Sequence, residues 1–125
     1  MTCIFCEKTD NLFENDLAKA FFDKFPASKG HILIVPRRHV PDYFGLTNEE
    51  HAAVQELLTK SKCYLDDQFA PDGYNIGANV GQAGGQTVFH CHIHLIPRYA
   101  GDCPEPAGGV RGAIPGKQTY QQRGL

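Results

Sequence analysis

Residues 90–96 read His-Cys-His-Ile-His-Leu-Ile, and this stretch is the part of the chain that decides the fold. Successive side chains of a β-strand point to opposite faces, so alternating residue types over residues 88–96 predict one strand. Its core-facing positions are Phe89, Cys91, Ile93 and Leu95. Its opposite face carries His90, His92 and His94 as a row of imidazoles.

Neighbouring imidazoles in such a row stand about 6.8 Å apart, which suits two kinds of chemistry. Alternate histidines on a strand can chelate zinc, and an imidazole can act as the nucleophile in phosphoryl transfer. The third interpretation is a chance cluster on a solvent-facing strand. Half of the six histidines fall within five residues, and this clustering favours a functional site.

The segments upstream predict further strands. Two short apolar stretches at residues 12–14 and 17–22 flank the polar turn Asn15-Asp16, which is typical of a hairpin. Residues 31–35 form a β-branched run that ends at Pro36, which has no amide hydrogen to donate. Residues 74–80 resemble a strand, and the glycine-rich loop at residues 81–85 follows it.

Thr47 and Glu50 form the capping-box pattern that begins a helix. Apolar or small residues recur at helical spacing downstream, at Ala53, Val54, Leu57, Leu58, Ser61 and Leu65. One stripe of the helix therefore packs inward, and we expect the helix to end near Asp66. Pro71-Asp72-Gly73 then redirects the chain.

Length and charge limit the class of protein. A chain of 125 residues, 42% of them apolar, predicts one domain with a real core. The net charge of −2 argues against duplex nucleic acid as the partner. Neither a secretory signal nor an apolar run of about 18 residues is present, so we expect a cytoplasmic protein that does not enter a membrane. Five cysteines, an odd number, favour the same reducing compartment.

Cys3 and Cys6 are the one cysteine pair with chelating spacing. A tetrahedral zinc site needs two further ligands, for which histidines are the candidates. A redox pair and two small buried residues are the alternatives. We expect Cys63 and Cys91 to pack in the core, and Cys103 to be an ordinary thiol of the tail.

Together these features resemble the histidine triad (HIT) family. Its signature is three histidines that are separated by single apolar residues and followed by two more apolar residues, as in residues 90–96. The resemblance covers roughly residues 3–99 and is highly specific. Besides the triad it rests on Asp23, the strand at residues 31–36, Asn79, the loop at residues 81–85 and Gln86-Thr87-Val88. It implies an α+β fold, with a five-stranded antiparallel sheet and a long helix packed on it, and a homodimer. Residues 1–99 would form the domain core. Residues 100–125 would be a Gly/Pro-rich tail, docked on that domain or partly disordered.

The resemblance also implies catalytic roles. His92 would attack the α-phosphate of a nucleotide and hold the nucleotide until water releases it. This needs a neutral imidazole whose other nitrogen bonds a carbonyl. His94, Gln86 and His31 would stabilise the charge that builds on the phosphoryl oxygens.

Nucleotide-binding and metal residues follow from the same resemblance. Asp23 would bind the ribose hydroxyls, and Asn79 would orient the phosphate end. Gly84 and Gly85 would let the backbone approach the phosphate, and Thr87 would complete the nucleotide-binding residues. Zinc-bearing members suggest a structural Zn²⁺ ion that fixes the N-terminus to the sheet. Its ligands would be Cys3, Cys6, His39 and His90.

The tail favours one branch of the family. Arg98-Tyr99, residues 108–112, Ile114-Pro115, Lys117 and Tyr120 resemble bacterial-type diadenosine polyphosphate hydrolases, and the chain has no tryptophan, which the phosphoramidase branch usually carries near its end. The sequence thus favours an enzyme that hydrolyses dinucleoside polyphosphates such as diadenosine tetraphosphate. The alternatives are a purine nucleoside phosphoramidase, which would cleave a P–N bond with the same residues, and a non-catalytic nucleotide-binding module.

Overall fold

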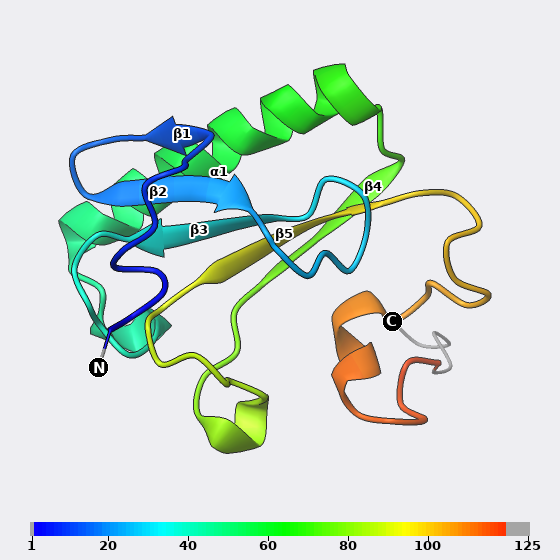
Figure 1. The fold of residues 1–125 in the computed structure, drawn as a ribbon. Helices are drawn as coiled ribbons and strands as arrows, with labels where there is room; N and C mark the ends of the chain where they lie inside the picture. Colours follow the sequence, from blue (N-terminus) through cyan, green and yellow to red (C-terminus); the bar gives the residue numbers. More distant parts are fainter. Residues whose placement is uncertain (1, 120–125) are drawn as a thin grey trace.

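The computed structural model describes residues 2–119 and contains one antiparallel sheet with a long helix across one face (Figure 1). The strands are β1 (Phe13–Glu14), β2 (Ala18–Phe22), β3 (Ile32–Pro36), β4 (Gly73–Gly77) and β5 (Ile93–Arg98), in the spatial order β1-β2-β3-β5-β4. The long helix is α1 (Asn48–Phe69). Three short 3₁₀ helices are η1 (Tyr43–Gly45), η2 (Gln82–Gly84) and η3 (Gly109–Ala113). The predicted α+β architecture is confirmed.

Helix α1 begins at the predicted capping box. Thr47 Oγ1 accepts a hydrogen bond from the Glu50 amide at 3.1 Å, and Glu50 Oε1 accepts one from the Thr47 amide at 2.9 Å. The helix runs three residues beyond the expected end, to Phe69. It ends at Ala70, whose left-handed φ of 48° turns the chain and lets its amide bond the Leu65 carbonyl at 3.2 Å.

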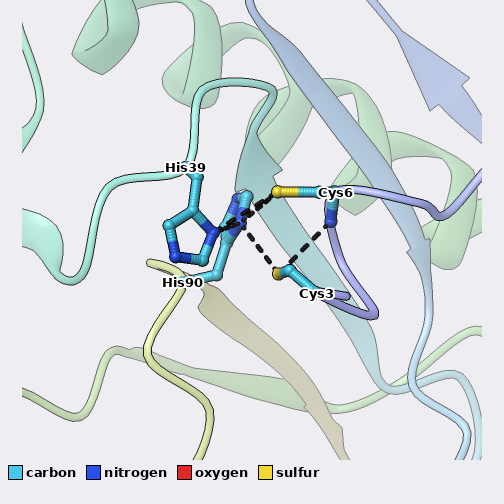
Figure 2. Close-up of side chains that lie close together, drawn as sticks. All are labelled: Cys3, Cys6, His39 and His90. Carbon is cyan, nitrogen blue, oxygen red and sulfur yellow. Dashed lines mark hydrogen bonds between the residues drawn. The ribbon is translucent and has the colours of Figure 1, made fainter. Parts of the chain in front are cut away.

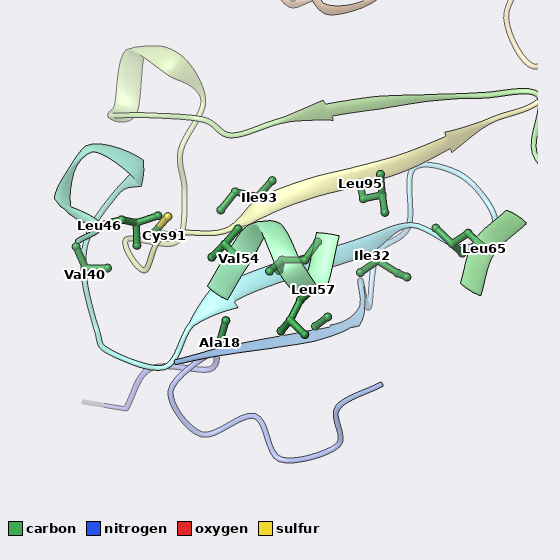
Figure 3. Close-up of a cluster of buried hydrophobic side chains, with 12 residues drawn as sticks. Ala18, Ile32, Val40, Leu46, Val54, Leu57, Leu65, Cys91, Ile93 and Leu95 are labelled. Carbon is green, nitrogen blue, oxygen red and sulfur yellow. The ribbon is translucent and has the colours of Figure 1, made fainter. Parts of the chain in front are cut away.

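The main core lies between α1 and the sheet (Figure 3). It consists of buried apolar side chains from the strands, the helix and the loop that follows β3: Ala18, Ala20, Ile32, Ile34, Val40, Leu46, Val54, Leu57, Leu65, Cys91, Ile93 and Leu95. A second, smaller cluster on the helix-free face joins Phe5 to Phe21, Leu33 and Val35. The N-terminal segment therefore covers part of the face opposite the helix.

The histidine segment differs from the prediction at its start. Strand β5 begins at Ile93 and not at residue 88, because the Cys91 amide bonds the Val40 carbonyl at 2.7 Å in the loop after β3. Cys91, Ile93 and Leu95 face the core as predicted, but Phe89 is 49% exposed, so its predicted burial is wrong. The continuous strand carrying all three histidines is likewise wrong, since only His94 lies within β5.

Two further expectations need correction. Strand β4 ends at Gly77 and not at residue 80. Cys63 is exposed, because it lies outside the inward stripe that Leu57, Ser61 and Leu65 form on α1.

The described part of the Gly/Pro-rich tail contains the short helix η3. Gly108 and Gly109 adopt positive φ angles of 93° and 45° at its start, a conformation that glycine takes without strain. Tyr120 and the rest of residues 120–125 lie outside the described residues. Within residues 2–119, no helix is both long and apolar enough to cross a membrane.

Candidate functional site

His92 is buried immediately before β5 and lines a cavity of about 640 Å³ on the helix-free face of the sheet. Its Nδ1 lies 2.9 Å from the carbonyl oxygen of His90. A carbonyl only accepts, so Nδ1 must carry the proton and donate. In the neutral ring this leaves the Nε2 lone pair free, which is the form that a nucleophilic imidazole requires.

A hydrogen-bond chain sets the protonation of the neighbouring imidazoles. The Ala27 amide donates to His31 Nδ1 at 2.9 Å, so the neutral ring of His31 carries its proton on Nε2. That proton is donated to His94 Nδ1 at 2.9 Å, which leaves His94 with a proton on Nε2. The buried ring of His31 and the partly buried ring of His94 thus form a chain, which ends in the Nε2–H donor of His94.

His94 remains neutral at physiological pH. Burial lowers its pKa to about 4, and the nearby imidazoles of His92 and His31 contribute to the shift. Burial also lowers the pKa of His31. The ring centroids of His92 and His94 are 5.2 Å apart, so a nucleophile with a free lone pair lies beside a neutral N–H donor.

The cavity combines aromatic walls with a few charged groups. Its apolar lining is Ile4, Phe5, Phe21, Phe22, Phe25, Leu33 and Val88. Its polar lining is Lys8, Asp23, Lys24, Thr87, His92 and His94. Such a cavity suits a molecule that carries a flat apolar ring and an anionic group.

Asp23 lies at the edge of this cavity with its carboxylate partly free. One oxygen accepts a hydrogen bond from the Phe25 amide at 2.8 Å, and the other lies 3.5 Å from His31 Nε2. Its side chain is 16% exposed, so the carboxylate can also accept hydrogen bonds from hydroxyl groups of a bound molecule.

Four of the residues predicted for catalysis or nucleotide binding lie outside the cavity lining, and they are His31, Gln86, Asn79 and Gly85. Gln86 is buried and uses its whole amide on backbone: Oε1 accepts from Gly81, and Nε2 donates to the carbonyls of Pro41 and Val88 at 2.6 and 3.1 Å. Asn79 and Gly85 lie on the same loop, with Asn79 Nδ2 3.5 Å from the Gly85 carbonyl. In this structure Gln86 therefore braces the loop, and no part of its amide is left for a phosphate.

The four predicted metal ligands come together in one cluster (Figure 2). His90 Nδ1 lies 3.4 Å from both Cys3 Sγ and Cys6 Sγ, and 3.2 Å from His39 Nδ1. Cys6 Sγ lies 3.3 Å from His39 Nδ1. Tetrahedral zinc, with bonds of about 2.1 Å to nitrogen and about 2.3 Å to sulfur, separates its ligand atoms by about 3.4–3.8 Å, within a few tenths of an ångström of the distances in the cluster. The spacing of these side chains therefore fits a zinc ion.

The protonation of His90 fits the metal as well. Its Nε2 lies 2.8 Å from the carbonyl of Pro36 and must donate to it, so the Nδ1 lone pair points into the cluster. Asp23, His31 and His94 also have ligand atoms within 4.8 Å of one another. That group fits a metal poorly, because the Ala27 amide occupies His31 Nδ1 and keeps the proton on Nε2.

Several residues of the cavity were not predicted from the sequence. Phe5, whose ring centroid lies 5.1 Å from that of His92, stands between Cys3 and Cys6 in the sequence, and its place inside that chelating pair was the available signal. Lys8, Lys24 and Phe25 carry no signal of their own, because only the fold brings their segments to the cavity.

The chain is similar in sequence to known proteins of one family. The family model "HIT domain" matches residues 7–101. Adenosine 5'-monophosphoramidase hnt1 of Schizosaccharomyces pombe is 36% identical over 104 residues, which cover 78% of this chain and 75% of that protein.

Solved structures agree with the fold. A HIT family protein from Bacillus anthracis is 38% identical with a TM-score of 0.73, over 78% of this chain and 73% of that chain. A Zn-bound histidine triad family protein from Mycobacterium smegmatis is 30% identical with a TM-score of 0.73, over 81% of this chain and 78% of that chain.

Proposed function

The chain belongs to the HIT family, and from this premise we propose that it hydrolyses dinucleoside polyphosphates, such as diadenosine tetraphosphate, through a nucleotide held covalently on His92. Family members are generally nucleotide hydrolases. The observation that carries the proposal is the His92 ring: Nδ1 donates to the His90 carbonyl, and the Nε2 lone pair is free in a ring that lines the cavity.

In the first step, Nε2 of His92 attacks the α-phosphorus. The P–N bond forms, the bond to the bridging oxygen breaks, and the nucleoside polyphosphate leaves with that electron pair. The Nε2 proton of His94 is available to the phosphoryl oxygens as their charge grows. In the second step, water attacks the same phosphorus and loses one proton to solvent, the P–N bond breaks with its electron pair returning to Nε2, and a nucleoside monophosphate leaves the neutral imidazole.

The charges around the cavity support a polyanionic leaving group. Two lysines, Lys8 and Lys24, line the cavity, against one carboxylate, Asp23. A leaving nucleoside polyphosphate carries several negative charges, which lysines attract at close range. In this proposal Asp23 accepts hydrogen bonds from ribose hydroxyls, and Thr87 contacts the phosphate. Asn79 and Gly85, which lie on the loop after β4 and outside the cavity lining, would orient the phosphate end.

A phosphoramidase is the second candidate, and one observation favours it. The fission-yeast relative carries the name adenosine 5'-monophosphoramidase. The same His92 would then attack a phosphorus whose leaving group is an amine. Comparing kcat/KM for diadenosine tetraphosphate and for an adenosine phosphoramidate separates the two. A clear preference for the phosphoramidate would overturn the choice of substrate and leave His92 as the nucleophile.

Trapping the intermediate tests the mechanism. Protein mixed with diadenosine tetraphosphate and quenched during turnover should carry a nucleoside monophosphate on the peptide that contains His92, as measured by mass spectrometry. The His92→Asn variant should lose both adduct and turnover, whereas His51→Asn, on the outer part of α1, should keep both. Binding without turnover in the unsubstituted protein would instead indicate a non-catalytic nucleotide-binding module.

We further propose that Cys3, Cys6, His39 and His90 hold a structural zinc ion. The ligand spacing supports this, as does the Zn-bound relative from Mycobacterium smegmatis. Bound zinc would crosslink the N-terminal segment to the loop after β3 and to the histidine segment. Metal analysis of protein purified without chelators should give close to one zinc per chain, and a value near zero would refute the site.

The resemblance also leads us to propose a homodimer. In support, β4 is an edge strand of the sheet, and Ile76 on it is 51% exposed. Light scattering coupled to size-exclusion chromatography should give twice the mass of the chain. A monomer at micromolar concentration would contradict the proposal.

A further inference from the structure

Lys19 is a buried lysine that the catalytic proposal does not use. It lies in β2, its side chain is 4% exposed, and it is the single lysine or arginine within residues 2–119 that is buried. Its ammonium group lies 2.6 Å from the carbonyl of Phe5, 3.4 Å from that of Cys6 and 2.9 Å from that of Lys8. An ammonium group has three donors, so all three of them go to carbonyls of one short segment.

An apolar residue would suit this position better than lysine if packing were its sole purpose. Lys19 shares its side of β2 with Phe21, next to Leu33 and Val35 of the smaller core cluster. Removing an ammonium group from water is costly, and carbonyl dipoles offset that cost only in part. The position therefore indicates that holding these carbonyls matters.

The segment that Lys19 holds is residues 3–8, which we name the N-terminal arm. The arm contains no strand or helix. Its Glu7 amide bonds the Cys3 carbonyl, and the chain first pairs with β2 beyond the arm, where the Leu12 amide bonds the Ala20 carbonyl. Lys19 thus ties the arm to β2 through its backbone, whereas a metal ion would hold it through the two sulfur atoms.

The arm reaches the nucleophile through Phe5. The Phe5 ring is 7% exposed, and its centroid lies 5.1 Å from that of His92 and 5.9 Å from that of His90, both at steep interplanar angles. The hydrogen bond to the His90 carbonyl fixes one edge of the His92 ring. Packing against Phe5 limits the rotation that remains.

We propose that Lys19 is a positioning residue for His92, which acts by holding the Phe5 carbonyl and thereby the Phe5 ring against the imidazole. This inference rests on the proposed role of His92 as nucleophile. The bond to Phe5 is the shortest of the three that Lys19 makes. A nucleophile displaced by about 1 Å can lose 100-fold in rate, so a loss of this support should reduce the rate of the chemical step.

The variant Lys19→Met keeps the aliphatic stem and removes the three donors. With saturating zinc, we expect kcat for diadenosine tetraphosphate to fall at least about tenfold while KM stays within about threefold. Lys60→Met, the same substitution at an exposed position of α1, is the matched control and should leave both constants unchanged. If Lys19→Met lowers the melting temperature but changes kcat by less than twofold, Lys19 is merely structural and the proposal is wrong.

A double-mutant cycle tests the route through Phe5. Phe5→Leu alone should lower kcat, and adding Lys19→Met to it should cause little further loss, because both changes remove the same support. Independent, multiplicative losses would overturn the route. Lys19→Arg keeps charged donors and should retain kcat within about threefold, which guards against a Met variant that folds poorly.

A measurement without turnover separates this inference from the proposed function. The ¹⁵N chemical shifts of His92 should report one tautomer, with the proton on Nδ1, in the unsubstituted protein and in Lys60→Met. In Lys19→Met the two nitrogen shifts should move toward each other as the ring samples other orientations. Unchanged shifts would refute the positioning role. If the shifts change as expected in Lys19→Met but the unsubstituted protein shows no turnover, only the proposed reaction is refuted.

Discussion

Replacing Glu50 with glutamine should lower the free energy of unfolding by about 2 kcal/mol at pH 7. Glu50 lies in the first turn of helix α1, and its carboxylate accepts hydrogen bonds from Arg38 Nε at 3.0 Å and Arg38 Nη2 at 2.8 Å, as well as from the Thr47 amide. Its side chain is 5% exposed. The variant keeps the shape of the side chain but removes the charge that these donors stabilise.

The magnitude follows from the pKa of this carboxyl group. The hydrogen bonds from Arg38 lower the pKa of Glu50 from its ordinary 4.5 to about 2, and the bond from the Thr47 amide adds to the effect. At about 1.4 kcal/mol per pH unit, this difference corresponds to roughly 3.5 kcal/mol. The Arg38 side chain is 51% exposed, so solvent screening reduces the expected loss to about 2 kcal/mol.

The stabilisation also has a defined pH dependence. Because the folded pKa lies below the unfolded one, the contribution is complete above about pH 4.5 and is lost as the pH falls toward about 2. Urea unfolding followed by circular dichroism measures the difference between Glu50→Gln and the unsubstituted protein at each pH. That difference should be largest at pH 7 and shrink below pH 4.5.

Glu49→Gln is the matched control, since Glu49 is an exposed carboxylate in the same first turn of α1. Its loss should be at most about 0.5 kcal/mol, the value typical of a charge near a helix N-terminus. Equal losses for Glu49→Gln and Glu50→Gln would refute the reasoning. So would a loss for Glu50→Gln that does not change between pH 6 and pH 3.

Three further outcomes are expected. Burial lowers the pKa of both His94 and His31, so the unfolded chain binds more protons than the folded one at mildly acidic pH. The free energy of unfolding should therefore fall as the pH drops from about 6.5 to about 4. A pH-independent free energy in urea titrations over that range would contradict this. Removing zinc with a chelator should lower the melting temperature of the unsubstituted protein by several degrees. The Cys6→Ser variant should already melt at the lower temperature and change little when the chelator is added. Equal responses of the two proteins to the chelator would argue against the zinc site. Lys24→Ala and Lys8→Ala should each raise KM for diadenosine tetraphosphate severalfold, and KM should depend less on salt concentration than in the unsubstituted enzyme. An unchanged KM in both variants would remove the charge argument for a polyphosphate substrate.

Local patterns predicted most of the fold because they depend on near neighbours in the chain. The capping box needs only Thr47 and Glu50, and both hydrogen bonds are present. The limits of the strands were less predictable. Residues 88–92 alternate like a strand, yet Cys91 bonds the Val40 carbonyl, 51 positions earlier, and β5 begins only after that contact. A partner so distant in sequence leaves no local signal.

The candidate site divides in the same way. The histidine spacing and the resemblance pointed to the residues that the structure brings together around the cavity and in the Cys/His cluster. Asn79 and Gly85 lie outside the cavity lining, and so does Gln86. Its type and position suit a phosphate donor, but the backbone of three loop residues takes its amide. Hydrogen bonds to backbone are set by the path of the loops, which residue types alone do not specify.

The sequence by itself determined which chemical groups this protein brings to the site: a clustered set of imidazoles, a chelating pair of cysteines and a capped helix to support the sheet. These follow from residue type and spacing, which the chain fixes before it folds. Only the tertiary structure decided the state of those groups. Which ring nitrogen carries the proton depends on whether a carbonyl or an amide of a distant segment lies beside it, as the Pro36 carbonyl does for His90 and the Ala27 amide for His31.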